Sequence, residues 1–185
     1  MYLIEMDPLP RYVTTHLTLA IRTQSYCITR LLIELGEDVN ENDGIGYTPL
    51  VTACTVRRDD IVKLLIDNGA DVNAQSFSGL RPLDYACSLN SVECVRLLLD
   101  AGAVVDYNDP GIPFTPLIHA VAAGGFEVVQ ELISRGADPR KDNTMGFYAI
   151  NWASQYLRQC TNDFERKERQ QIWDLLLRVN PPSGE

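Results

Sequence analysis

An alanine recurs at an almost constant interval along the 185-residue chain, with steps of 33, 33, 34 and 33 residues. The five positions are Ala20, Ala53, Ala86, Ala120 and Ala153. A leucine or isoleucine stands three residues before each of them, and four glycines repeat in the same phase: Gly36, Gly69, Gly102 and Gly136. A fixed period of this length indicates a solenoid, in which each unit buries its apolar face against its neighbours.

One unit, residues 43–75, shows what the period contains. The segment Thr48-Pro49-Leu50 predicts a helix start, because threonine caps a helix and proline needs no N–H partner in the first turn. Ala53 continues the apolar face of this short first helix. Ile61 and Leu65 lie on the apolar stripe of a second helix, which Gly69 ends. The unit is therefore predicted to be a turn followed by two antiparallel helices.

Such a unit at a 33-residue period resembles the ankyrin repeat. The segments that carry the resemblance are Thr48-Pro49-Leu50, Arg81-Pro82-Leu83 and Thr115-Pro116-Leu117, with the second-helix segments that begin at Leu31, Leu64 and Leu97. The resemblance implies an all-α ankyrin-repeat solenoid of helix-turn-helix units joined by β-turn or hairpin fingers. We expect one domain over residues 1–185, with atypical capping repeats at both ends. The expected repeats span about 10–42, 43–75, 76–108, 109–142 and 143–180.

The repeats depart from the family pattern in two respects. The family usually has histidine after Thr-Pro-Leu, where this chain has Thr18, Val51, Asp84, Ile118 and Asn151. We therefore expect fewer hydrogen bonds between neighbouring turns and a less rigid array. Arg81 stands where the capping threonine is usual, which should cost about 1 kcal/mol at that helix start. In the last unit, an insertion that includes residues 165–169 is expected before the second helix, giving a longer, charged cap.

Composition limits the class of partner. The net charge is −9 and the isoelectric point about 4.7, which argues against duplex nucleic acid or an anionic membrane and favours a protein with a basic or neutral surface. No apolar run reaches the length of a membrane helix, and the first residues do not read as a signal peptide. Five cysteines, an odd number, indicate a reducing compartment, the cytoplasm or the nucleus. We expect a monomer.

The sequence offers no catalytic, cofactor or metal site, so we expect no enzyme activity. The two histidines, His16 and His119, are three repeats apart and cannot share a metal ion. His119 is expected to be a packed or partly exposed structural residue. No C-x-x-C pair occurs, and Cys54 and Cys87 take equivalent positions. They are predicted to be buried core thiols, not zinc ligands, and Cys27 is likewise expected to pack.

The resemblance implies that a partner binds the concave face, which is formed by the turn tips and the exposed side of the first helices. The predicted contact residues are Ile45, Tyr47, Phe77, Leu80, Ile112, Phe114, Met145 and Phe147 in the turns and Val56, Leu89 and Tyr156 on the first helices. Because the turn residues recur at one interval, they are predicted to form a contiguous apolar strip, which marks a binding surface. Alternatively, each side chain packs on the next turn.

The function predicted from these features is a non-catalytic protein–protein interaction module. The alternatives are a regulatory or targeting subunit or fragment of a larger enzyme, a ubiquitin-ligase adaptor, and a viral or bacterial effector. The segment that ends at Asn73, and less closely the one that ends at Asn40, resembles the sequence that a cytosolic asparaginyl hydroxylase modifies in many ankyrin proteins. The alternative is that both asparagines satisfy backbone groups of the turn.

Overall fold

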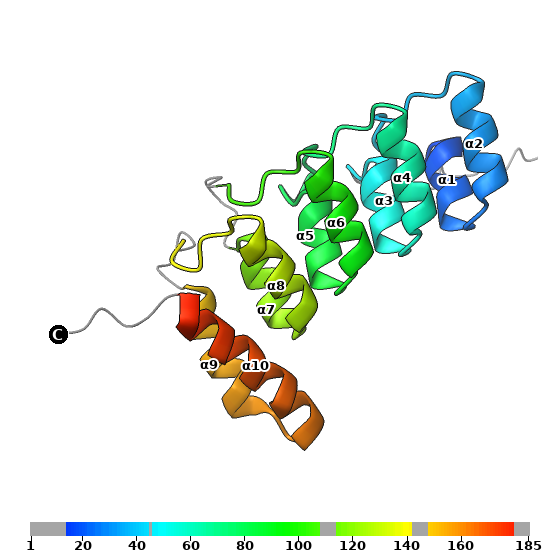
Figure 1. Cartoon of the computed structure of the whole chain (residues 1–185). Helices are drawn as coiled ribbons and strands as arrows, with labels where there is room; N and C mark the ends of the chain where they lie inside the picture. Colours follow the sequence, from blue (N-terminus) through cyan, green and yellow to red (C-terminus); the bar gives the residue numbers. More distant parts are fainter. Residues whose placement is uncertain (1–13, 45, 108–113, 142–147, 180–185) are drawn as a thin grey trace, which may run out of the picture.

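The computed structural model describes residues 14–44, 46–107, 114–141 and 148–179, and these ranges hold ten α-helices and no strand. The helices come in five consecutive pairs that stack along one direction (Figure 1), and each predicted unit contains one pair. The pairs are α1 (His16–Arg22) and α2 (Tyr26–Glu34), α3 (Pro49–Thr55) and α4 (Asp59–Asp67), α5 (Pro82–Ser88) and α6 (Val92–Asp100), α7 (Pro116–Ala123) and α8 (Phe126–Ser134), and α9 (Ala149–Gln159) and α10 (Asp163–Val179).

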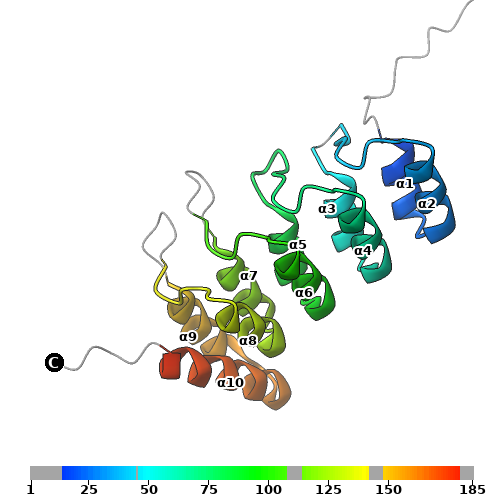
Figure 2. The ribbon, with the colours of Figure 1, turned by 45° about the horizontal axis from the view of Figure 1, so that its top comes forward.

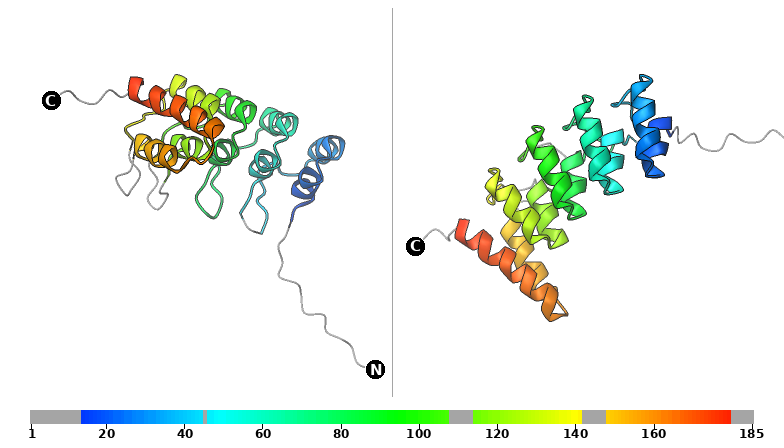
Figure 3. Two further views of the ribbon diagram at one scale, coloured as in Figure 1. Left: turned by 90° about the horizontal axis from the view of Figure 1, so that it is seen from below. Right: turned by 45° about the vertical axis from the view of Figure 1, so that its right-hand side comes forward.

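The odd-numbered helices form one layer and the even-numbered helices a second layer (Figure 2). Within each layer a helix contacts its counterpart in the next pair: α1 contacts α3, α3 contacts α5, and α2 contacts α4. The loops from α2 to α3 and from α4 to α5 project from the odd-numbered layer (Figure 3, left). We call these loops and their equivalents the fingers, and the side formed by the fingers and the odd-numbered helices the finger face.

The recurring apolar residues of the sequence form the core between the pairs. The leucine of the first helix and the alanine three residues later are at most 5% exposed in the first four pairs. These residues are Leu17, Ala20, Leu50, Ala53, Leu83, Ala86, Leu117 and Ala120. Burial of this kind repeats in the second helices, where Ile61, Leu65, Leu98 and Leu132 are fully buried. One apolar core therefore runs along the whole array, as expected for a solenoid.

Threonine begins three of the first helices. The hydroxyls of Thr15, Thr48 and Thr115 each accept a hydrogen bond from the backbone N–H three residues later, at 3.1, 3.2 and 3.3 Å. These bonds satisfy N–H groups that have no partner within the helix.

Where the capping threonine is missing, the residue three positions later bonds back to the cap. The carboxylate of Asp84 accepts from the backbone N–H of Arg81 at 2.8 Å, and the amide oxygen of Asn151 accepts from that of Tyr148 at 3.1 Å. The loss expected at Arg81 is therefore offset by Asp84. Two of the residues that replace the family's histidine thus stabilise the helix starts that lack threonine.

The C-terminal pair differs from the others in its second helix. α10 has 17 residues, of which Ile172 and Leu176 are buried against the array. Residues 165–169, expected as part of an insertion before the second helix, instead form early turns of α10, so that detail of the prediction was wrong. None of the helices in the described ranges is long and apolar enough to cross a bilayer.

Candidate protein-binding surface

The first two described fingers contact each other where Phe77 meets Gly46, and an aromatic pair joins the first finger to helix α5. The ring of Tyr47 meets that of Tyr85 edge to face, with centroids 5.5 Å apart, and the Tyr85 hydroxyl shares a hydrogen bond with Ser76. Phe77 lies against Gly46, where a Cβ would come within 2.4 Å of the phenylalanine Cγ. Gly46 also has a φ of +85°, so only glycine fits this approach without strain. The first two described fingers therefore touch each other at Gly46 and Phe77.

A second aromatic cluster joins the fourth and fifth pairs. Phe114 packs edge to face on His119 and Trp152, at centroid distances of 5.6 and 5.4 Å. Trp152 stacks on Tyr156 at 5.8 Å, and the guanidinium of Arg169 lies 4.8 Å from the centre of the Tyr156 ring. The cation–π contact ties the layer of α9 to the terminal helix α10.

The predicted contact residues fall into three groups. Ile45, Ile112, Met145 and Phe147 lie outside the described residues. Phe77 and Leu89 are exposed, to 73% and 37%. The half-buried residues are Tyr47, Val56, Leu80, Phe114 and Tyr156. The strip predicted from the sequence therefore stays a prediction, with Phe77 as its most exposed described member.

Three aromatic side chains of these clusters are not among the contact residues predicted from the sequence. Tyr85, His119 and Trp152 occupy one equivalent position, directly before the recurring alanine of the first helix. Each contacts a predicted residue of a finger or first helix. The sequence contained a signal for these three residues, because each directly precedes an alanine of the repeat period. The residue at that position lies on the first helix of its repeat, next to the fingers.

A buried carboxylate lies beneath the finger face between the third and fourth pairs. Asp84 is 1% exposed, and it accepts hydrogen bonds from the Tyr107 hydroxyl and the Arg81 backbone N–H. Burial raises the pKa of the Asp84 carboxyl, although both hydrogen bonds oppose this rise. Burial and the neighbouring carboxylate in turn raise the pKa of Tyr107, whose ring lies 4.3 Å from the Arg81 guanidinium carbon.

His119 is half-buried between the aromatic cluster and Asp84, as predicted for a structural residue. Burial lowers the pKa of His119, an effect that the nearby Asp84 partly opposes. Among the described residues, the His119 Nε2 atom has no hydrogen-bond partner.

Asn40 and Asn73 each join one repeat to the next. The Asn40 side chain donates to the Gly69 carbonyl at 3.2 Å and accepts from the Asp71 N–H at 2.8 Å. Asn73 makes the same two bonds to Gly102 and Val104, at 3.2 and 2.9 Å. Both asparagines therefore satisfy backbone groups, and their hydroxylation stays a prediction that requires these bonds to open.

The cysteines and acidic residues form no metal site in the part of the chain that the structure describes. The buried cysteines are Cys54, Cys87, Cys94 and Cys160. For Cys54 and Cys87, burial agrees with the prediction that they are core thiols. Cys27 is exposed, so the expectation that it packs was wrong. It lies on α2, which has no described helix on its outer side (Figure 1).

A family profile described as ankyrin repeats (3 copies) matches residues 17–110 and residues 75–143, which together cover more than half of the chain. The chain belongs to the ankyrin-repeat family. The ankyrin solenoid predicted from the period is thereby confirmed. Ankyrin repeats are in general protein–protein interaction modules. No curated protein matches the chain.

Proposed function

We propose that this ankyrin-repeat chain is a non-catalytic module that binds a partner protein through its finger face. The observation that carries the proposal is Phe77, an aromatic side chain that is 73% exposed at a finger and lies against Gly46. Aromatic anchors of this kind dominate the energy of many protein interfaces. The Tyr47–Tyr85 pair beside it adds half-buried aromatic area.

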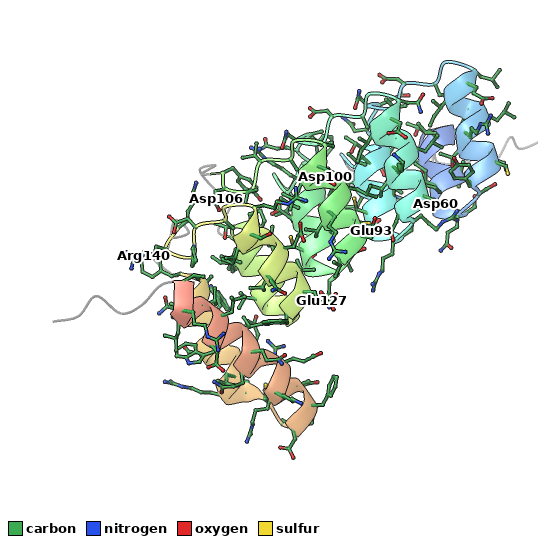
Figure 4. The ribbon with its side chains drawn as sticks, in the orientation of Figure 1. Asp60, Glu93, Asp100, Asp106, Glu127 and Arg140 are labelled. Atoms are coloured by element: carbon green, nitrogen blue, oxygen red, sulfur yellow. The ribbon has the colours of Figure 1, made fainter. Side chains whose placement is uncertain are left out.

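The charge distribution supports the same face. Asp60, Glu93 and Glu127 lie at equivalent positions in the first turns of α4, α6 and α8, in the layer opposite the fingers (Figure 4). Acidic residues stabilise helix N-termini, and charged residues are depleted at the centre of protein interfaces. The even-numbered layer is therefore better suited to contact with solvent than to binding a partner protein. With a net charge of −9, the chain favours a partner whose surface is basic or neutral.

The finer roles depend on the partner. A catalytic partner would make the chain a regulatory or targeting subunit, and a ubiquitin-ligase component would make it an adaptor. A host protein would make it an effector. We propose a monomer in the cytoplasm or nucleus, where five unpaired cysteines are stable.

The test is affinity capture from the cognate lysate with three baits: the wild-type chain, Phe77→Ser and Phe164→Ser. Phe164 is a matched control, because it is also 73% exposed but lies on α10. We expect a protein that the wild type and Phe164→Ser capture equally and that Phe77→Ser captures roughly tenfold less. Circular dichroism should show that all three baits are folded.

Two results would contradict the proposal. If Phe77→Ser captures the same proteins in the same amounts, the finger face is not the binding surface. If the purified chain turns over substrates in a hydrolase or transferase screen, the module is not non-catalytic.

A further inference from the structure

One side chain in the loop after each of the second helices α2, α4 and α6 bonds to the backbone of the next repeat. In the first two of these loops it is Asn40 or Asn73, and each asparagine makes two bonds. The amide nitrogen donates to a glycine carbonyl, and the amide oxygen accepts from the N–H two residues after that glycine. We call this pair of bonds a clasp.

The third loop has Asp106 at this position (Figure 4), and a carboxylate has no donor. The Oδ2 atom of Asp106 accepts from the Asp138 N–H at 2.7 Å, the counterpart of the bond from the Asp71 N–H to Asn40. The Oδ1 atom takes the place of the amide nitrogen, and the glycine two residues before Asp138 is Gly136. Among the described residues, Oδ1 is buried without a hydrogen-bond partner. Ionised Asp106 therefore makes only half of a clasp.

A proton on Oδ1 would supply the missing donor. A protonated carboxyl group carries one O–H, which can donate to a carbonyl as the amide nitrogen of asparagine does. Solvent supplies this proton, and no covalent bond of the protein changes. The bond would also satisfy a buried acceptor that otherwise has neither water nor a donor, a situation that costs free energy.

The surroundings of Asp106 favour its protonated form. Burial raises the pKa of the Asp106 carboxyl above its ordinary value of 3.8. The Asp138 N–H and the Lys141 ammonium oppose this rise, whereas the Asp138 carboxylate adds to it. The charged groups that act on Asp106 thus come from the loop after α8, in the next repeat.

We propose that Asp106 is a pH-sensitive clasp between the third and fourth repeats. Ionised, it holds the Asp138 N–H alone. Protonated, it also donates to the Gly136 carbonyl and completes the pair of bonds that Asn40 and Asn73 make at every pH. Acidification thereby tightens this one joint of the array at the base of its finger.

The pH dependence has a definite sign. Because the pKa of Asp106 is raised in the folded chain, the folded chain binds this proton more tightly than the unfolded chain does. The contribution of Asp106 to stability is therefore fully present below pH 3.8 and is lost as the pH rises through the folded pKa. An asparagine at this position would keep both bonds over the whole range.

The test compares melting temperatures of the wild type, Asp106→Asn and Asn73→Asp at pH 7 and at about pH 4. At pH 7, Asp106→Asn should melt roughly 2–4 °C above the wild type, and Asn73→Asp should melt below it by a similar amount. Both differences should shrink at the lower pH. Asp84 and His119 titrate in all three chains, so their effects cancel in these differences.

Glu41→Gln controls for the loss of one negative charge, because Glu41 is an exposed carboxylate of a finger. If Glu41→Gln raises the melting temperature as much as Asp106→Asn does, the gain reflects net charge and the proposal is overturned. A gain from Asp106→Asn that is equal at both pH values would also overturn it.

A titration followed by NMR reads the clasp directly, without unfolding the chain. The carboxyl carbon of Asp106 and the carbonyl carbon of Gly136 should shift with one common midpoint above pH 3.8. The carbonyl carbon of Gly69, which accepts from Asn40, is the internal reference that should not shift at that midpoint. A Gly136 signal that does not follow Asp106, or an Asp106 midpoint at or below 3.8, would overturn the proposal.

Discussion

Replacing Asp84 with alanine should destabilise the array although it removes a buried charge. The carboxylate is 1% exposed and accepts from the Arg81 N–H and the Tyr107 hydroxyl. Without it, the first helix of the third repeat loses its cap, worth about 1 kcal/mol. The hydroxyl of Tyr107, a residue that is 8% exposed, also loses its acceptor, at a cost of about 1–3 kcal/mol.

One effect acts in the opposite direction. Burial raises the pKa of Asp84, so its ionised form is disfavoured in the folded chain, and alanine relieves that cost. We therefore expect a net loss of about 2 kcal/mol, near the lower end of the sum. For a chain of this size, the loss corresponds to a fall in melting temperature of roughly 4–8 °C.

The assay is urea denaturation followed by circular dichroism at pH 7, with Asp84→Asn as the matched control. Asparagine keeps an acceptor for the Arg81 N–H and loses the charge, so it should stay within about 1 kcal/mol of the wild type. A double-mutant cycle with Tyr107→Phe should show that the two residues are energetically coupled. If Asp84→Ala unfolds at the wild-type urea midpoint, the hydrogen bonds of Asp84 contribute nothing and the reasoning fails.

Two further predictions concern the core and the pH dependence. Ala86→Asp places an unpaired charge at a fully buried position of the central repeat, so the chain should unfold or aggregate. A soluble variant with an unchanged urea midpoint would contradict the assignment of the recurring alanine to the core. Because burial lowers the pKa of His119 below its ordinary value of 6.5, the unfolded chain binds the proton at higher pH than the folded chain. The stability should therefore fall as the pH drops through 6.5, and the melting temperature of His119→Gln should depend less on pH between 7 and 5. Parallel pH profiles of the two proteins would count against this role of His119.

The period of the sequence was sufficient to predict most of the fold, because helix starts and core positions depend on local chemistry. α3, α5 and α7 begin at the proline of each motif, Pro49, Pro82 and Pro116. The start of α10 could not be predicted in this way. Alignment to the period assigns residues 165–169 to an insertion, although a run of glutamate, arginine and lysine favours a helix on its own.

The surface was harder to predict, because exposure depends on what lies beyond each repeat. Cys27 takes a position on a second helix, but its repeat stands at the end of the described array, so the thiol is exposed. The bond from the Arg81 N–H to Asp84 links two departures from the family pattern that look independent in the sequence. Four of the predicted contact residues lie outside the described ranges, and five others are half-buried.

The two layers of the array differ in how they can contribute to binding. In the even-numbered layer, neighbouring repeats are joined by exposed ion pairs, such as Arg96 with Glu131 and Arg135 with Asp100. Ion pairs of this kind contribute little to stability and are screened by salt. They therefore help to align neighbouring repeats and to keep the surface soluble, and they add little affinity for a partner protein. The finger face instead joins neighbouring repeats through aromatic contacts, such as Tyr47 with Tyr85 and Phe114 with Trp152. A partner that covers several fingers would bury this area across repeat boundaries. Because each repeat stabilises only its neighbours, such a partner should strengthen the coupling between repeats and raise the stability of the whole array on binding.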